Sequence, residues 1–348
     1  MKFKIIYLLF FVASLVAQEN YVKGRVTEKS TGKPIPGVNI YFNETTSGTT
    51  SDLMGNFKIR KIIPGSHELV ASMVGFEVYS VNMVIKNNSS ISIDVELEEM
   101  LYEFGTAEVI GNRDNVWQRD LIFFKKIFLG KSPFSIDCEI TNPYSLDFSN
   151  DYYSFKAKAR EPLIIINNSL GYEIICDLLE FEYIEGMKNF KYKIKTFFKE
   201  IEDAPVGKSD YWMLNRNLAF EGSVNHFLKS LLNRKVTEEG FNISITNAPY
   251  NKIGDVIGFQ EISEDSLLTT DQYGVLKKIS FRNYLKVVYQ DPVSNLYSLS
   301  YLLLNHSDLT IDDYGIPMEL MPFQTYGSWA EKGVADMLPR SFVPQKNF

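Results

Sequence analysis

The sequence predicts a mainly β protein in which an N-terminal β-sandwich is followed by a β-rich α+β domain. The chain has 348 residues, and because a domain usually holds about 100 to 200 residues, two domains are expected. Phe (25) and Tyr (20) are abundant, and both side chains favour strands. Over residues 21–98, short runs of alternating polarity are separated by turn residues at intervals of about 8 to 12 positions, which is typical of a sandwich.

The first predicted domain, residues 18–111, contains the clearest strand patterns. In residues 91–98, apolar residues alternate with serine and acids, which predicts a strand with one buried face. Val38, Ile40 and Phe42 alternate in the same way. The segment from Asp52 to Gly55 predicts a tight hairpin turn, because the Asp side chain can accept hydrogen bonds from the turn backbone and Gly can close it.

The second predicted domain, residues 112–348, combines two helices with many strands. The first helix has a candidate N-cap at Asp114, a terminator at Gly130 and apolar residues at helical spacing: Trp117, Leu121, Phe124 and Phe128. A second amphipathic helix begins after Ser223, with its apolar stripe at Val224, Phe227, Leu228, Leu231 and Leu232. Strands are expected at residues 134–140, 153–159, 163–166, 172–182, 190–198, 241–246, 276–289 and 298–304. Turn signals at 271–274 and 312–315 predict two further hairpins.

Residues 1–17 have the pattern of a secretory signal peptide. Lys2 and Lys4 precede an uncharged apolar run that ends at Ala17, after which a signal peptidase can cut. The run is shorter than the roughly 20 residues that span a bilayer, so the mature chain is expected to have no transmembrane segment. We therefore expect export to the periplasm, the outer membrane or the extracellular side.

Charge and cysteine content narrow the classes of partner. The formal charge is -7, and an acidic chain binds polyanions poorly, so nucleic acid is not an expected partner. Cys138 and Cys176 are the only cysteines, and in an exported protein they can form a disulfide. Both also alternate with apolar neighbours, so two buried thiols are equally compatible with the pattern.

An ordered series of short motifs in the first domain resembles the carboxypeptidase regulatory-like domain family. The residues that carry the resemblance are Gly24, Pro34, Gly37, Asp52, Gly55, Phe57, Pro64, Gly65, Gly75 and Phe76. The resemblance implies a seven-stranded transthyretin-like sandwich, which is a non-catalytic module found beside carboxypeptidases and in front of TonB-dependent outer-membrane transporters. Residues 128–130, 140–143 and 168–172 resemble an uncharacterised extension found behind this module.

No catalytic, metal or cofactor motif stands out in the sequence. A zinc carboxypeptidase needs a His and a Glu close together, but none of His67, His226 and His306 has a Glu three residues later. The sequence also lacks a Gly-x-Ser-x-Gly nucleophile elbow and a complete phosphate-binding loop. We therefore expect no enzyme activity, no metal and no cofactor.

Two groups of residues are candidates for a binding surface. Lys191, Lys193 and Lys195 alternate along one strand and could bind an acidic glycan or lipid head group, although lysines on an edge strand also prevent aggregation. A second group of large aromatic residues could stack on sugars, although core packing is the commoner role of such residues. Its members are Trp212, Tyr326 and Trp329.

The sequence favours a non-catalytic interaction protein of the cell envelope that binds a partner protein or a glycan. One alternative is an enzyme of unrecognised type within residues 112–348. That alternative requires five residues to converge in one cleft: Glu180, Glu182, His226, His306 and Asp308. A third hypothesis is structural: residues 21–98 help the second domain to fold or hold it in place.

Overall fold

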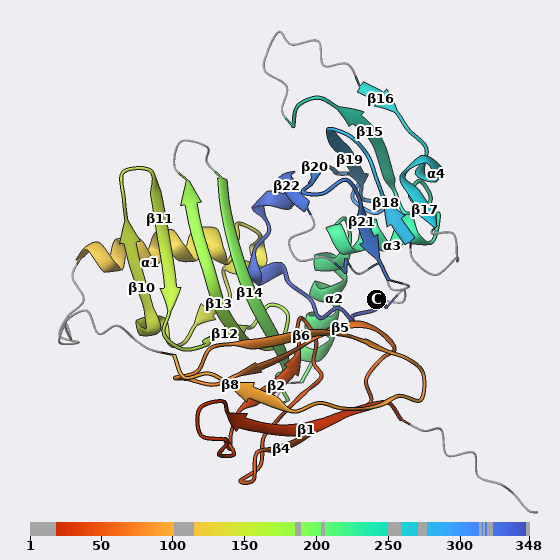
Figure 1. Cartoon of the computed structure of the whole chain (residues 1–348). Helices are drawn as coiled ribbons and strands as arrows, with labels where there is room; N and C mark the ends of the chain where they lie inside the picture. Colours follow the sequence, from red (N-terminus) through yellow and green to blue (C-terminus); the bar gives the residue numbers. More distant parts are fainter. Residues whose placement is uncertain are drawn as a thin grey trace, which may run out of the picture.

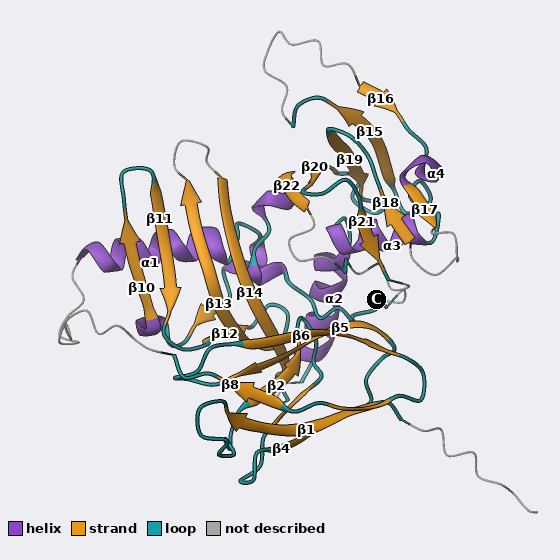
Figure 2. Cartoon of the chain, viewed as in Figure 1, coloured by secondary structure: helices purple, strands orange, loops and turns teal. Residues whose placement is uncertain are grey.

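The computed structural model describes residues 19–100, 115–184, 189–202, 206–249, 259–270, 277–312, 315, 317–318 and 323–345. Within these residues the chain forms three hydrophobic cores. Figure 1 shows the N-terminal sandwich, in red and orange, packed against a second sheet in yellow and green, with the C-terminal sheets in cyan and blue. Most of the regular structure is strand (Figure 2), which confirms the mainly β fold class.

The N-terminal core lies between two sheets of four strands each. In one sheet β4, β1 and β7 are neighbours and β8 also pairs with β1, whereas the other has the order β3-β2-β5-β6. The strands are β1 Tyr21–Glu28, β2 Asn39–Phe42, β3 Gly48–Thr50, β4 Asn56–Arg60, β5 Gly65–Ser72, β6 Tyr79–Ile85, β7 Ser90–Ser92 and β8 Val95–Leu97. Val38, Ile40 and Phe42 are fully buried between the sheets, as their alternation predicts. The turn from Asp52 also forms as expected, because its Oδ1 accepts hydrogen bonds from the amides of Met54 and Asn56, each at 2.8 Å.

Strands β7 and β8 are two parts of one strand that runs parallel to β1. Tyr21 pairs with Ser90 and Val26 pairs with Val95, so the register is the same before and after the break. At the break, Oδ1 of Asp94 accepts a hydrogen bond from the amide of Arg25 in place of a backbone carbonyl. If β7 and β8 are counted as one strand, the sandwich has seven strands, as the family resemblance implies.

The second core lies between a six-stranded sheet and helix α1, Asn115–Phe128. The sheet has the order β10-β11-β13-β12-β9, and β14 pairs with the other edge of β13. Its strands are β9 Cys138–Ile140, β10 Leu146–Asn150, β11 Ser154–Ala159, β12 Leu163–Asn167, β13 Tyr172–Ile184 and β14 Asn189–Glu200. The four predicted apolar positions of α1 are buried, and the proposed cap Asp114 lies outside the described residues. The expected strand at 134–140 is shorter than predicted, because a 3-10 turn occupies Pro133–Ser135.

The third core belongs to the C-terminal sheets and helix α3, Val224–Leu232. One sheet has the order β16-β15-β19-β20-β22 and the other has the order β17-β18-β21. The elements are β15 Phe241–Thr246, β16 Phe259–Glu261, α4 Glu264–Leu267, β17 Leu268–Thr270, β18 Lys277–Ile279, β19 Tyr284–Gln290, β20 Tyr297–Leu304, β21 Leu309–Ile311 and β22 Phe323–Gly327. Ser223 caps α3 as predicted, since its Oγ accepts a hydrogen bond from the amide of His226. The strand expected at 276–289 is divided into β18 and β19, and Asn283 adopts a left-handed conformation just before β19.

Helix α2, Lys208–Phe220, is absent from the sequence-based prediction. Figure 2 shows this helix between the β14 sheet and the C-terminal sheets. Its buried side includes Asn215, Arg216 and Asn217, which are each 7% exposed. Nδ2 of Asn215 donates to the carbonyl of Ser169, and Nε of Arg216 donates to the carbonyl of Leu170. The buried side also includes Trp212, Ala219 and Phe220, while the exposed side includes Tyr211, Leu214 and Leu218. Because both sides mix polar and apolar residues, the segment lacks the single apolar stripe by which helices are recognised in a sequence.

The N-terminal sandwich is joined to the second sheet by a buried carboxylate. Asp177 on β13 is 5% exposed, and its two carboxylate oxygens accept hydrogen bonds from the Tyr41 hydroxyl and the Ser72 hydroxyl, each at 2.5 Å. Tyr41 alternates with the core residues of β2, so it would point to solvent in an isolated sandwich. Here it is fully buried, and its ring stacks on Phe197 with 5.3 Å between centroids.

Backbone pairing and ion pairs extend this junction. The amide of Glu44 donates to the carbonyl of Thr196, and the carbonyl of Thr45 accepts from the amide of Phe198, so the turn after β2 pairs with the edge of β14. The buried Lys195 ammonium forms an ion pair with Glu68 of β5. Each backbone or charged group that the junction buries therefore has a hydrogen-bonding or ionic partner, because a buried polar group without one is destabilising.

A Gly24→Ala substitution is expected to separate β1 from β7 and β8. A Cβ at position 24 would lie 1.6 Å from the carbonyl oxygen of Ile93, and a backbone atom cannot move aside as a flexible side chain can. We expect the free energy of unfolding to fall by about 2 kcal/mol or more. Hydrogen exchange should show lost protection at Ile93 and Val95. Gly32→Ala strains a left-handed backbone (φ 69°), but its Cβ has no neighbour within 4 Å, so this variant should lose stability without selective loss of protection at Ile93 and Val95. Equal loss at these two amides in both variants would contradict the argument.

Asp177 is expected to make the stability of the protein depend on pH. Burial raises the pKa of its carboxyl above the ordinary value of 3.8. The native state then binds more protons than the unfolded state above about pH 4, so this group's contribution to stability falls as the pH rises through its folded pKa. Relative to Asp177→Asn, the melting temperature of the unmodified protein should therefore fall from pH 4 upward. Asp151→Asn should give a difference of the opposite sign, because hydrogen bonds lower the pKa of Asp151; the largest contribution comes from the Tyr153 amide, followed by Ser154. A difference in melting temperature between the unmodified protein and Asp177→Asn that does not change with pH would refute the assignment.

Candidate functional site

The predicted basic strand face does not form a free row of lysines. Lys195 is 3% exposed and forms an ion pair with Glu68 in the domain junction, so it cannot bind an external ligand. Lys191 is exposed but lies between two acids, with its Nζ 2.9 Å from Glu180 and 3.1 Å from Glu182. Of the three lysines, only Lys193 keeps the role of a candidate cation for a ligand. Strand β14 is an edge strand, so the protective role of its lysines fits the structure.

The two tryptophans proposed to stack on sugars are core residues. Trp212 and Trp329 are each 5% exposed. The Trp212 indole N–H donates to the carbonyl of Asn168 at 2.8 Å, and that of Trp329 donates to the carbonyl of Gly222 at 2.7 Å. This part of the prediction is wrong, because both rings complete packing between elements distant in sequence. Tyr326 is half-buried, and its hydroxyl donates to Gln324 at 3.1 Å.

Four of the five residues required by the enzyme alternative have local partners in three different parts of the structure. Glu180 and Glu182 contact Lys191 on the second sheet, whereas Asp308 contacts Lys278 beside the third core. His226 is 7% exposed, and its Nδ1 accepts a hydrogen bond from the amide of Gly222 at 3.1 Å. Burial lowers the pKa of His226, which keeps the ring neutral. These contacts give His226 a structural role within α3.

The structure decides between a disulfide and two free thiols for the two cysteines. Cys138 and Cys176 are both free thiols, on strands β9 and β13. Burial raises the pKa of Cys138 to about 12, so the reactive thiolate is scarce at neutral pH. Among the described residues, no group of three or more His, Cys, Asp or Glu side chains has an arrangement that could hold a metal ion.

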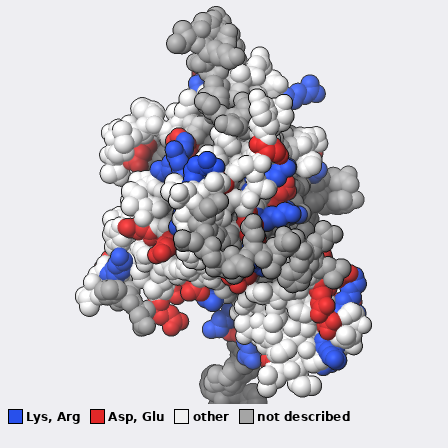
Figure 3. All heavy atoms as spheres, turned by 90° about the vertical axis from the view of Figure 1, so that its left-hand side faces the viewer, with Lys and Arg blue, Asp and Glu red and all other residues white. Residues whose placement is uncertain are grey.

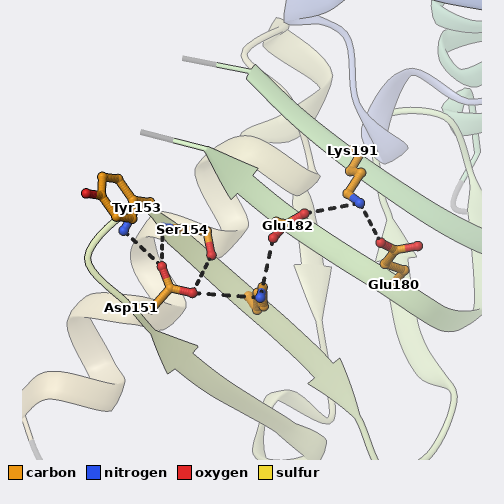
Figure 4. Close-up of polar contacts among 7 residues, drawn as sticks. Asp151, Tyr153, Ser154, Glu180, Glu182 and Lys191 are labelled. Atoms are coloured by element: carbon orange, nitrogen blue, oxygen red, sulfur yellow. Dashed lines mark hydrogen bonds and ion pairs between the residues drawn. The ribbon is translucent and has the colours of Figure 1, made fainter. Parts of the chain in front are cut away.

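A ladder of charged residues crosses the exposed half of the second sheet (Figure 4). We name it the charged ladder; its members are Asp151, Lys156, Glu182, Lys191 and Glu180. Lys156 lies 3.7 Å from Asp151 and 3.4 Å from Glu182, and Lys191 joins Glu182 to Glu180. Hydrogen bonding to Lys191 lowers the pKa of Glu182, and the two glutamates raise the pKa of Lys191. Such shifts fix the charges at neutral pH, so the ladder suits recognition rather than acid–base catalysis.

The hairpin tip beside the ladder presents two exposed tyrosines. Tyr152 is 86% exposed and Tyr153 is 73% exposed, and their rings meet edge to face with centroids 4.8 Å apart. The tip is held in shape by Asp151, whose Oδ1 accepts hydrogen bonds from the amides of Tyr153 and Ser154 (Figure 4). Sequence reasoning treated this segment as the start of a strand. An Asp followed by two aromatic residues at a turn is the signal that could have identified it.

A groove separates the N-terminal sandwich from the second sheet, next to the buried Asp177. Its volume is about 400 Å³, and its walls come from residues 72–78 and Met100 on one side and from residues 158–162 and 177–179 on the other. Val74, Met100 and Leu179 are 57%, 37% and 38% exposed. The junction therefore covers one end of the sheet's outer face and leaves the other end, with the charged ladder, open to solvent.

Charges of both signs are interspersed on the surface seen in Figure 3. The charged ladder itself contains three acids and two lysines, in alternating order. A surface of this kind favours a partner with complementary alternating charges over a uniform polyanion. None of the helices in the described ranges is long and apolar enough to cross a bilayer.

Comparison with known proteins identifies relatives of the N-terminal part. TonB-dependent receptor P3 of Formosa agariphila is 33% identical over 129 residues, which are 35% of this chain and 13% of the receptor. TonB-dependent receptor SusC of Bacteroides thetaiotaomicron is 27% identical over 114 residues, which are 32% of this chain and 11% of the receptor. The chain thus spans only about an eighth of the length of these relatives.

Among solved structures, the pilus 2b backbone protein of group B streptococcus is 14% identical, with 23% of this chain and 40% of that chain aligned. Its TM-score is 0.20, which supports no inference about this protein. A family model is more informative. Residues 22–107 match the model described as CarboxypepD_reg-like domain, over the segment that contains the seven-stranded sandwich. Residues 22–107 are therefore a CarboxypepD_reg-like domain, as their motifs indicate.

Proposed function

We propose that this chain is a non-catalytic binding protein of the bacterial cell envelope, in which the CarboxypepD_reg-like domain fixes the position of a β-rich binding domain. The relatives of the first domain are TonB-dependent receptors, which supports an envelope location. The signal-peptide pattern of residues 1–17 supports export to that compartment. The partner binds the exposed end of the second sheet, at the charged ladder and the two tyrosines.

The observation that carries this proposal is the division of one sheet face into a covered end and an open end. The covered end holds Asp177 and Lys195, which are buried against the sandwich. The open end holds the charged ladder, with Tyr152 and Tyr153 at its margin. Exposed tyrosines bring large contact area at a small entropic cost, and they are enriched at the energetic centres of interfaces. A protein partner fits this surface better than a small ligand, because the charges of the ladder are already paired with one another.

Site-specific photo-cross-linking in intact cells tests the proposal. A photoreactive residue at position 152 should give one discrete cross-linked protein species. The same residue at position 293 should not, although Val293 is equally accessible at 89% exposed and lies in the turn between β19 and β20. Replacement of Tyr153 by Ser in the position-152 protein should reduce the yield severalfold, because one anchor of the contact is lost.

Three outcomes would count against this assignment. Equal products from positions 152 and 293 would indicate non-specific capture. Cross-linking to a glycan instead of a protein would show that the partner is a saccharide. Turnover of peptide, ester or glycoside substrates that is lost in Glu182→Gln would favour the enzyme alternative.

Deletion of residues 21–98 is expected to lower the melting temperature and the yield of the remaining chain. The deletion exposes Phe197 and leaves the edge of β14 without the backbone partners at residues 44 and 45. An open strand edge also invites aggregation, which light scattering would detect. A remaining fragment with the melting temperature of the whole protein would show that the sandwich does not support the second sheet.

A further inference from the structure

Three polar side chains are buried together where the N-terminal sandwich meets the second sheet. Lys195 of β14 is 3% exposed, and Asn43, directly after β2, is 8% exposed. The Glu68 side chain on β5 lies between them. Its Oε1 contacts the Lys195 ammonium, and its Oε2 accepts a hydrogen bond from Nδ2 of Asn43 at 3.1 Å. An amine nitrogen and a carboxamide nitrogen thus share one carboxylate in a site that is shielded from water.

The carboxamide of Asn43 is held at both of its ends. Its Nδ2 donates to Glu68, and its Oδ1 accepts a hydrogen bond from the backbone amide of Thr196 at 2.9 Å. The backbone amide of Asn43 also donates to the carbonyl of Glu68 at 2.9 Å, which extends the pairing of β2 with β5. Thr196 follows Lys195 on β14, so the carboxamide oxygen is bound by the strand that carries the amine.

These contacts supply each part that acyl transfer from an amide to an amine needs. The reaction requires a nucleophilic amine, a donor for the charge that develops on the amide oxygen, and an acid that protonates the leaving nitrogen. Lys195 has the amine, and the Thr196 amide already binds the oxygen. Glu68 contacts both nitrogens, so one carboxyl group can take a proton from the amine and deliver it to the leaving nitrogen.

We propose that Lys195 and Asn43 form an isopeptide bond, which joins the second sheet covalently to the N-terminal sandwich. A proton first passes from the Lys195 ammonium to Oε1 of Glu68, and burial favours this step because it neutralises two charges. The amine nitrogen then attacks Cγ of Asn43, and the Thr196 amide stabilises the oxyanion. The bond from Nζ to Cγ forms and the bond from Cγ to Nδ2 breaks.

The reaction balances without a further reactant. Of the three protons on the Lys195 ammonium, one stays on the nitrogen of the new amide. The other two pass by way of Glu68 to Nδ2 of Asn43, which already carries two and leaves as an ammonium ion. The positive charge of Lys195 leaves with it, and Glu68 ends as the carboxylate that it was at the start.

The bond is a cross-link between two domains that a disulfide cannot join. Cys138 and Cys176 are the only cysteines of the chain, and both lie on strands of the second sheet. Residues 43 and 195 are far apart in the sequence, so a covalent bond between them restricts the unfolded chain, as a disulfide over a long loop does. The bond therefore makes the relative position of the sandwich and the second sheet permanent.

Mass spectrometry of the purified and denatured protein tests the proposal. The intact mass should be lower than the sequence mass by one ammonia, about 17 Da. After digestion with trypsin, tandem spectra should identify one branched peptide that contains both Asn43 and Lys195. If a signal peptidase cuts after Ala17, cyclisation of Gln18 also releases ammonia, but that loss produces no branched peptide and is common to all variants.

Three variants sharpen this test. Glu68→Gln should lack the branched peptide, because the group that carries the protons is lost, and Lys195→Met should lack it because the amine is lost. Lys191→Met is the matched control. Lys191 lies on the same strand and also contacts two acids, but it is exposed and its ion pairs are with Glu180 and Glu182. This variant should keep the branched peptide and the loss of ammonia.

Three results would overturn the proposal. A full sequence mass without a branched peptide in the unmodified protein would leave the three residues as an ion pair and a hydrogen bond, whether or not any variant folds. A mass lower by one water, with the branch at Glu68, would assign the bond to that carboxyl group instead of Asn43. A branched peptide that persists in Lys195→Met would assign the nucleophile to another lysine.

Discussion

The buried contact of Asp177 with Tyr41 and Ser72 determines how the surfaces of this protein are arranged. A carboxylate this deeply buried is tolerated only when both of its oxygens have donors, and the two hydroxyls come from two neighbouring strands of the sandwich. The contact therefore allows one relative position of the two sheets. The groove beside it and the open end with the charged ladder are consequences of that position.

Buried hydrogen bonds and ion pairs also join other segments of this chain that are distant in sequence. Helix α2 is attached to the turn at residues 168–171 through Asn215, Arg216 and the indole of Trp212, all of which donate to backbone carbonyls. Arg340 forms an ion pair with Glu44, which connects the C-terminal segment to the sandwich. Contacts of this kind add specificity to the apolar cores, because each hydrogen bond is satisfied in one arrangement only.

Local patterns predicted much of the fold and little of the candidate site. Strands with alternating polarity, such as β15, and helices with an apolar stripe, such as α1 and α3, form where expected because one face of each packs on a core. Helix α2 was missed because polar and apolar residues occur on both its buried and its exposed side. The lysine row was misjudged in part, because alternation shows that Lys191 and Lys195 share a face but not which acids lie opposite on β13 and β5.

The sequence by itself determined the strand and turn chemistry of the first domain, the positions of two helices and the family of residues 22–107. Those features depend on residues close together in the chain, so their pattern is visible without a fold. Only the tertiary structure decided that Tyr41 is buried, that Trp212 and Trp329 are core residues, and that Tyr152 and Tyr153 are exposed. The physical reason is that exposure depends on what packs against a residue, and the partners of Tyr41 and Trp329 come from segments more than a hundred positions away.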